Sequence, residues 1–227
     1  MRPPIEFLFP PEIGAELIYS FVIVVCSLMI YYATKEMYEL SSYKGIKYFR
    51  QAFLFFAIAY FFRYSIRFLL LLFNMSDMPE ISPMFVGSIS LFIFLYSSSM
   101  AIFYLLYSVM WKRWSHSKLK IYLFNLLALV IALIGTFLRG IETNLALNMI
   151  LLIFICFVLF IAYKDSKNKQ KGKSLFIIYL ILFIFWVLNV IDILIPRFLQ
   201  IYRLVIYIVS ILLFMIILYK VLKKTGD

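Results

Sequence analysis

The sequence is poor in the residues that most often carry chemistry, with one histidine (His116) and two cysteines (Cys26 and Cys156) in 227 residues. One chain therefore cannot ligate haem through two histidines or build a zinc site from two or three. Hydrolases that pair serine with histidine are disfavoured for the same reason. The two cysteines do not form the framework of a disulfide-rich domain. We expect no catalytic residues, no metal and no cofactor, and we predict that the protein is not an enzyme.

Proline and glycine are also sparse, with seven residues of each. The prolines lie at the ends of the long apolar segments or between them, at positions 3, 4, 10, 11, 79, 83 and 196. Because proline breaks helices, its absence from the interiors predicts uninterrupted helices. The connections hold about a dozen residues at most, which is too few for a soluble domain. Methionines near acids in the connection 74–84 suit Cu(I), but methionine is also ordinary apolar filler, and we interpret them as filler.

The sequence is rich in apolar residues, which make up 65% of it and raise its mean hydropathy to +1.00. Soluble domains are closer to half apolar. A helix needs about 20 apolar residues to cross the hydrocarbon core. The predicted spans are 13–32, 46–73, 83–110, 119–138, 145–163, 174–194 and 198–222. We therefore expect an all-α, multi-pass protein of the cell membrane, with residues 1–227 forming one seven-helix transmembrane domain. The first 14 residues lack the pattern of a signal peptide and are expected to be an extended lead-in.

The charges predict an orientation. If the connections alternate between the two sides, one side receives 16 cations and four acids, and the other receives six cations and seven acids. Cytoplasmic connections collect lysine and arginine, so we expect the N-terminus outside and the C-terminus in the cytoplasm. The net charge of +11 is then a topology signal with attraction for anionic lipids, and we expect no nucleic-acid partner. The basic run 164–173 is interpreted as a solvated connection, with docking of a cytoplasmic protein as the alternative.

The second predicted span carries arginines at an unusual depth. Arg63 and Arg67 are four residues apart and share a helix face. Arg63 lies about 24 Å along the helix from Lys47 at the inner edge. A charge well inside the bilayer costs a few kcal/mol unless it is paired, so a partner is expected.

The sixth span supplies a candidate partner. Asn189 follows Lys173 by the same 16 residues that separate Arg63 from Lys47, and Asp192 lies one turn further. We expect Arg63 or Arg67 to pair with Asp192, and further polar residues to line the same outer cavity. The candidate ligand-binding residues are Arg63, Arg67, Trp186, Asn189, Asp192, Glu16 and Arg203. A purely structural ion pair that locks two helices is the alternative.

Two known architectures share the predicted topology. Seven spans with an external N-terminus match rhodopsins and seven-helix receptors, but a retinal pigment needs a lysine in the last span and an acid opposite it. Neither a lysine in 198–219 nor an acid in 83–110 is present. The arrangement also resembles that of small sugar transporters with three spans, one span and three spans. The matching register of Arg63 and Asn189 is compatible with such a repeat, whereas the lack of prolines inside the spans is not typical of it.

These observations favour a membrane sensor of the receptor-like class. An outward-facing polar pocket would bind a small ligand from outside, and the basic cytoplasmic face would contact a cytoplasmic or membrane protein partner. The alternatives are a transporter of a small molecule or ion that uses the same pocket, and a structural accessory subunit of a membrane complex.

Overall fold

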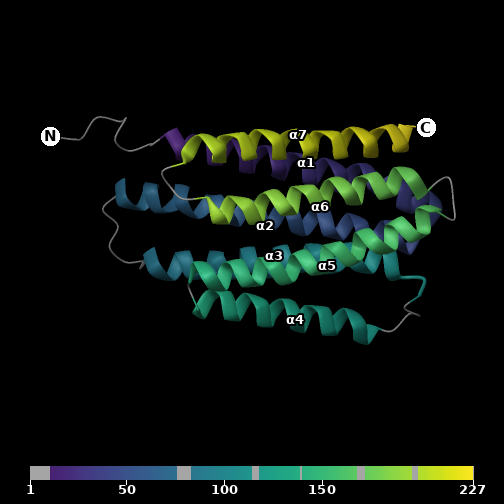
Figure 1. The fold of residues 1–227 in the computed structure, drawn as a ribbon, viewed down its shortest axis with the longest axis horizontal. Coiled ribbons are helices and arrows are strands. Elements are labelled where there is room, and N and C mark those ends of the chain that lie inside the picture. The colour runs from purple at the N-terminus through teal and green to yellow at the C-terminus, as the bar shows by residue number, and fades with distance from the viewer. Residues whose placement is uncertain are drawn as a thin grey trace.

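A computed structural model describes residues 11–75, 83–113, 118–138, 140–167, 172–195 and 199–226 and folds them into seven α-helices. The helices run up and down along one common direction (Figure 1). Their bounds are α1 Pro11–Ser41, α2 Lys44–Met75, α3 Pro83–Met110, α4 Lys118–Phe137, α5 Ile141–Lys167, α6 Gly172–Leu194 and α7 Gln200–Gly226.

Each predicted span falls on one helix, but several helices are longer than the spans. α1 continues past residue 32 to Ser41, and α5 extends at both ends to Ile141 and Lys167. The added turns include Lys35, Glu36, Glu39, Lys164 and Lys167, and lysine and glutamate favour helix in water as well as in lipid. A search for apolar residues identifies only the part of a helix that suits hydrocarbon. The predicted span therefore ends before the helix ends.

Six helices within the described residues are long and apolar enough to cross a membrane, which makes the chain a multi-pass helical membrane protein. These segments are Gly14–Ser41, Phe85–Met110, Leu119–Phe137, Ile141–Lys167, Leu175–Leu194 and Ile201–Lys223. The remaining helix, α2, differs because its described side chains include Lys47, Arg50 and Arg63. Its other face is deeply packed, since Phe53 and Phe56 are fully buried.

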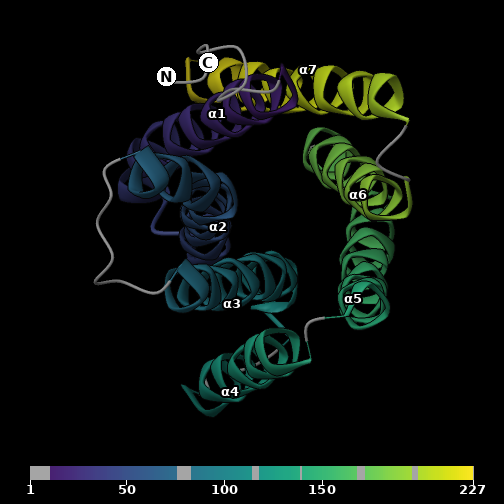
Figure 2. The ribbon, with the colours of Figure 1, turned by 90° about the vertical axis from the view of Figure 1, so that its left-hand side faces the viewer.

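Six of the helices form a closed ring. α1 packs on α2, α2 on α3, α3 on α5, α5 on α6, α6 on α7, and α7 returns to α1 (Figure 2). The helix α4 lies outside the ring and packs chiefly on α3. If α1, α2 and α3 are matched with α5, α6 and α7, each helix has neighbours in the ring that match those of its counterpart. The ring therefore has the neighbour pattern of a two-fold repeat, with α2 and α6 on opposite sides and α4 as the linker.

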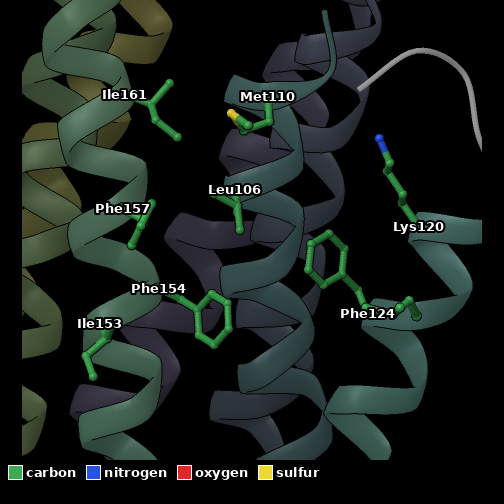
Figure 3. A pocket seen from close by; sticks show the side chains of 9 residues that line it. Leu106, Met110, Lys120, Phe124, Ile153, Phe154, Phe157 and Ile161 are labelled. Carbon is green, nitrogen blue, oxygen red and sulfur yellow. The ribbon is translucent and has the colours of Figure 1, made fainter. Parts of the chain in front are cut away.

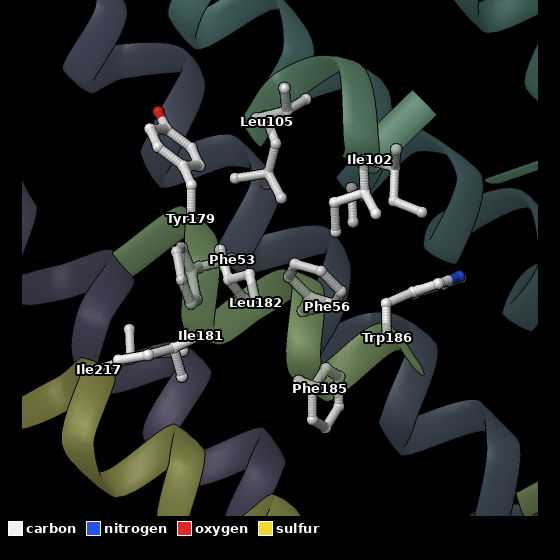
Figure 4. Packing of buried hydrophobic residues seen from close by; sticks show 14 of the residues in the cluster. Phe53, Phe56, Ile102, Leu105, Tyr179, Ile181, Leu182, Phe185, Trp186 and Ile217 are labelled. Atoms are coloured by element: carbon white, nitrogen blue, oxygen red, sulfur yellow. The ribbon is translucent and has the colours of Figure 1, made fainter. Parts of the chain in front are cut away.

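Aromatic side chains fill the middle of the ring. Phe53 and Phe56 of α2 contact Phe214 of α7, with ring centroids 6.4 and 6.2 Å apart. Phe214 also packs edge-on against Phe185 of α6 at 4.6 Å. All four rings are completely buried, and Figure 4 shows Phe53, Phe56 and Phe185 meeting between the helices. Such contacts hold α2, α6 and α7 together across the ring.

The two ends of the bundle differ in charge. One end, here called the lysine end, is where α2, α4 and α6 begin, and its described cations outnumber its acids, which are Glu36, Glu39 and Asp165. The opposite end, called the arginine end, is where α1, α3, α5 and α7 begin. Its described charged residues are Glu16, Arg63, Glu142, Asp192 and Arg203. The described lysines lie at the lysine end, whereas described arginines occur at both ends, with Arg50 and Arg113 at the lysine end and Arg63 and Arg203 at the arginine end.

Candidate functional site

A connected set of polar side chains lies at the arginine end between α2 and α6. The amide oxygen Oδ1 of Asn189 accepts two hydrogen bonds of 2.8 Å, one from the Tyr60 hydroxyl and one from Nη1 of Arg63. The other guanidinium nitrogen, Nη2 of Arg63, lies 3.2 Å from Oδ2 of Asp192. The amide of Asn189 donates to the Phe185 carbonyl one turn earlier at 2.9 Å, and this bond turns its oxygen toward α2.

Helix α7 joins the same acid from the other side. Nε of Arg203 lies 3.9 Å from Oδ1 of Asp192, so one carboxylate is shared by two arginines on two different helices. Nη2 of Arg203 donates at 3.0 Å to the carbonyl of Ile195, directly after the last residue of α6. The last carbonyl groups of a helix have no N–H donor within the helix, and a cation at the C-terminal end can donate to them. Arg203 therefore fastens the start of α7 to the end of α6.

The pair between Asp192 and Arg203 is incomplete. Within the described residues, Oδ1 of Asp192 and Nε of Arg203 are both buried and lack a hydrogen-bond partner. They face each other at 3.9 Å, which is an ion-pair distance but is longer than a hydrogen bond. Buried polar atoms normally have a hydrogen-bond partner. A further hydrogen-bonding group between these two atoms would supply the missing partners.

Stacked tyrosines extend the set to α1. Tyr19 stacks on Tyr207 with ring centroids 4.7 Å apart, and its hydroxyl lies 3.4 Å from that of Tyr60. The Tyr207 hydroxyl donates to Oε1 of Glu16 at 3.4 Å, and Glu16 is buried. Four ring helices, α1, α2, α6 and α7, thus contribute to one network.

The formal charges of the described members of the network balance. Its described members include two arginines, Arg63 and Arg203, and two acids, Asp192 and Glu16. The Arg63 guanidinium also lies 5.4 Å from the centre of the Phe94 ring on α3, where a cation–π attraction adds to the pairing. Its side chain is 20% exposed and that of Arg203 is 25% exposed, so both reach the molecular surface. Both side chains are thus partly exposed, although Nε of Arg203 is itself buried.

Of the two arginines predicted as partners of Asp192, Arg63 forms the ion pair, and Asn189, Arg203 and Glu16 belong to the same network. Trp186 lies apart from it, because its Nε1 points to the Asn148 carbonyl of α5 at 3.4 Å. The side chain of Arg67 and the connection 76–82 lie outside the described residues. That these residues bind a ligand stays a prediction.

The sequence interpretation missed the tyrosines of the network. Tyr60 lies three residues before Arg63 and therefore on the same helix face, which is a signal that could have identified it. Tyr19 lies three residues after Glu16 and Tyr207 lies four residues after Arg203, so the same spacing signal was present for both.

Comparison with known proteins places the chain in a family without assigning it a role. No protein-family model matches the sequence, and no solved structure matches it. An uncharacterized protein of Archaeoglobus fulgidus is 35% identical over 228 residues, covering 98% of this chain and 95% of the relative. The match thus extends through all seven helices. The chain belongs to the same family as this uncharacterized archaeal protein.

Proposed function

We propose that all seven helices cross the cell membrane, with the arginine end outside and the lysine end in the cytoplasm. Support for a seventh span comes from α2, which has 32 residues and packs between α1 and α3 in the ring. Its deepest described charge, Arg63, is paired with Asp192, which lowers the cost of placing it in lipid. The charge difference between the two ends supports the orientation.

We further propose that the protein is a non-enzymatic sensor of the receptor-like class whose outer site binds a small anion. The observation that carries this proposal is the shared carboxylate of Asp192, which Arg63 contacts closely and Arg203 only at 3.9 Å. A carboxylate or phosphate group of a ligand can complete the hydrogen bonding of Arg203, since the guanidinium fork suits both groups. The ligand then competes with the Asp192 carboxylate for the guanidinium group of Arg203, which lies in the first turn of α7.

Such competition would change how α7 sits against α6. Arg203 connects the two helices through Asp192 and the Ile195 carbonyl, so a change at Arg203 acts on the join between them. Both helices extend to the lysine end, where the last turns of α7 carry Lys220 and Lys223. A tilt of α7 would therefore rearrange basic side chains that a cytoplasmic or membrane protein partner can read.

The proposal is tested by ligand-dependent stabilisation of the purified protein in lipid nanodiscs. Added acetate or inorganic phosphate should raise the midpoint of thermal unfolding, because a ligand that binds only the folded state stabilises it. The Arg203→Gln variant should lose this shift. Arg113→Gln is the matched control, since Arg113 makes a 3.2 Å ion pair with Asp165 at the opposite end. Equal shifts in both variants, or no shift in the unmodified protein with either anion, would contradict an anion site at Arg203.

A transporter is the second candidate, and the neighbour pattern of the ring favours it. Parallel repeats related by an axis along the membrane normal occur in transporters, and the substrate then binds between the halves. Here the network lies between α2 and α6, and the buried rings of Phe53, Phe56, Phe185 and Phe214 close the path beyond it. Accumulation of the stabilising anion inside proteoliposomes would identify a transporter. Stabilisation without accumulation would favour the sensor. An accessory subunit with a structural network would show neither.

A further inference from the structure

A second candidate site lies far from the network, on the outer side of the ring. A cavity of about 600 Å³ opens between α3, α4 and α5 toward the lysine end (Figure 3). It forms because α4 packs on α3 and lies largely apart from α5. Its volume is within the range of about 300–1,000 Å³ that is typical of small-molecule sites.

The wall of this groove is almost entirely apolar. It is formed by side chains from three helices, among them Leu106, Met110, Phe124, Phe154 and Phe157. The α5 residues of the wall extend from Ile153 to Ile161, which corresponds to about 12 Å along a helix. A groove of this length and polarity suits a hydrocarbon chain, and its three helices are among those long and apolar enough to cross a membrane.

One cation stands at the mouth of the groove. Lys120 is the single charged residue among those that line it, and it lies near the start of α4 at the lysine end. In Figure 3 its ammonium group points toward the same end of the groove as Met110 and Ile161. The ammonium group is therefore positioned where a lipid whose chain occupies the groove would carry its headgroup phosphate.

We propose that this groove binds one anionic phospholipid from the leaflet at the lysine end. A hydrocarbon chain would occupy the apolar wall, and Lys120 would contact the phosphate. Basic pockets between transmembrane helices on the cytoplasmic side commonly bind anionic lipid headgroups, which supports this combination of wall and charge. The site is independent of the anion site proposed above, because the two share no residue and lie at opposite ends of the bundle.

The test is native mass spectrometry of the full chain titrated with phosphatidylglycerol or phosphatidylcholine of identical chains. The unmodified protein should retain phosphatidylglycerol in preference to phosphatidylcholine. Lys120→Gln should reduce that preference about fivefold, the effect expected of one lysine at a membrane surface. Ile153→Trp should weaken both lipids by the same factor, because it fills the wall without touching the charge. Ile153 is 60% exposed, so the larger side chain does not disturb the buried core.

Lys223→Gln is the matched control, since Lys223 is an exposed cation at the same end but on α7. It should keep the preference of the unmodified protein. Circular dichroism of each variant establishes that it is folded. Retention of the full preference in Lys120→Gln, or an equal loss in Lys223→Gln, would overturn the proposal. So would unchanged binding of both lipids in Ile153→Trp.

Discussion

The helices α2 and α6 hold equivalent places on opposite sides of the ring, yet they differ in the charges they carry. The described side chains of α2 include Lys44, Lys47, Arg50 and Arg63. Helix α6 contains Lys173 at its start and Asp192 near its end, and it is among the most apolar segments of the chain. The acid of the apolar helix pairs with the deepest cation of the charged helix. This difference indicates that the network joins two halves that share a layout but differ in charge.

The same comparison explains where the network lies. Arg63 and Asn189 are 126 residues apart, share the register of the two halves and contact each other at 2.8 Å. In a two-fold arrangement, equivalent residues meet only near the axis that relates them. The same separation relates further buried pairs, namely Ala52 and Ile178, Phe53 and Tyr179, Phe56 and Leu182, and Tyr60 and Trp186. The network therefore lies where α2 and α6 face each other across the ring.

Removing the shared acid should have the largest effect. Asp192→Ala leaves the guanidinium groups of Arg63 and Arg203 facing each other without their acid. Loss of one partner of a buried pair costs about 3–5 kcal/mol, and the partial exposure of both arginines reduces our expectation to about 2 kcal/mol. Thermal or denaturant unfolding in nanodiscs measures the loss. Asp165→Ala, which breaks an exposed pair at the lysine end, should cost less than about 1 kcal/mol.

A double-mutant cycle separates pairing from general damage. Arg63→Ala combined with Asp192→Ala should recover part of the summed loss, with a coupling of about 1 kcal/mol. Strictly additive losses would show that the two residues do not depend on each other, and the comparison of α2 with α6 would lose its central contact.

An exchange of the equivalent residues should have an intermediate effect. Asn189→Arg alone places a second guanidinium beside Arg63, and like charges at that distance repel. Adding Arg63→Asn restores one amide and one guanidinium group, with the amide now on α2 and the guanidinium on α6. The new arginine at position 189 then lies one turn from Asp192. The double variant should be more stable than Asn189→Arg by about 1 kcal/mol in the same unfolding measurement. A double variant no more stable than the single one would mean that the two positions are not interchangeable.

Much of the fold was predictable because lipid imposes a simple rule on the chain. A run of about 20 apolar residues has little alternative to a helix when water is absent, and each predicted span does lie on one helix. The ring order was not predictable, because most faces of these helices are apolar and the sequence does not mark which neighbour each face meets. The position of α4 outside the ring is an example.

The candidate site was predictable in part. Arg63, Asn189 and Asp192 stand out because polar residues deep in an apolar helix need partners. The direction of Trp186 could not be inferred from its spacing to Asn189, since its indole reaches across to the Asn148 carbonyl of α5. A tryptophan is long enough to bond with a neighbouring helix while it shares a face with a residue that bonds elsewhere. Spacing gives the side of a helix, whereas the partner depends on the packing of the whole ring.

The smallest expected effect comes from two aromatic residues at equivalent positions. Tyr60→Phe removes the hydroxyl that donates to Asn189, and Trp186→Phe removes the donor to the Asn148 carbonyl. Each should cost about 0.6 kcal/mol, the average for a hydrogen bond between membrane helices. The two should differ in anion-dependent stabilisation, because only Tyr60 contacts the residue that also holds Arg63. Tyr60→Phe should weaken the anion-dependent rise in the unfolding midpoint, and Trp186→Phe should leave that rise unchanged. Equal weakening in both variants would mean that the rise does not depend on the hydrogen bond from Tyr60 to Asn189.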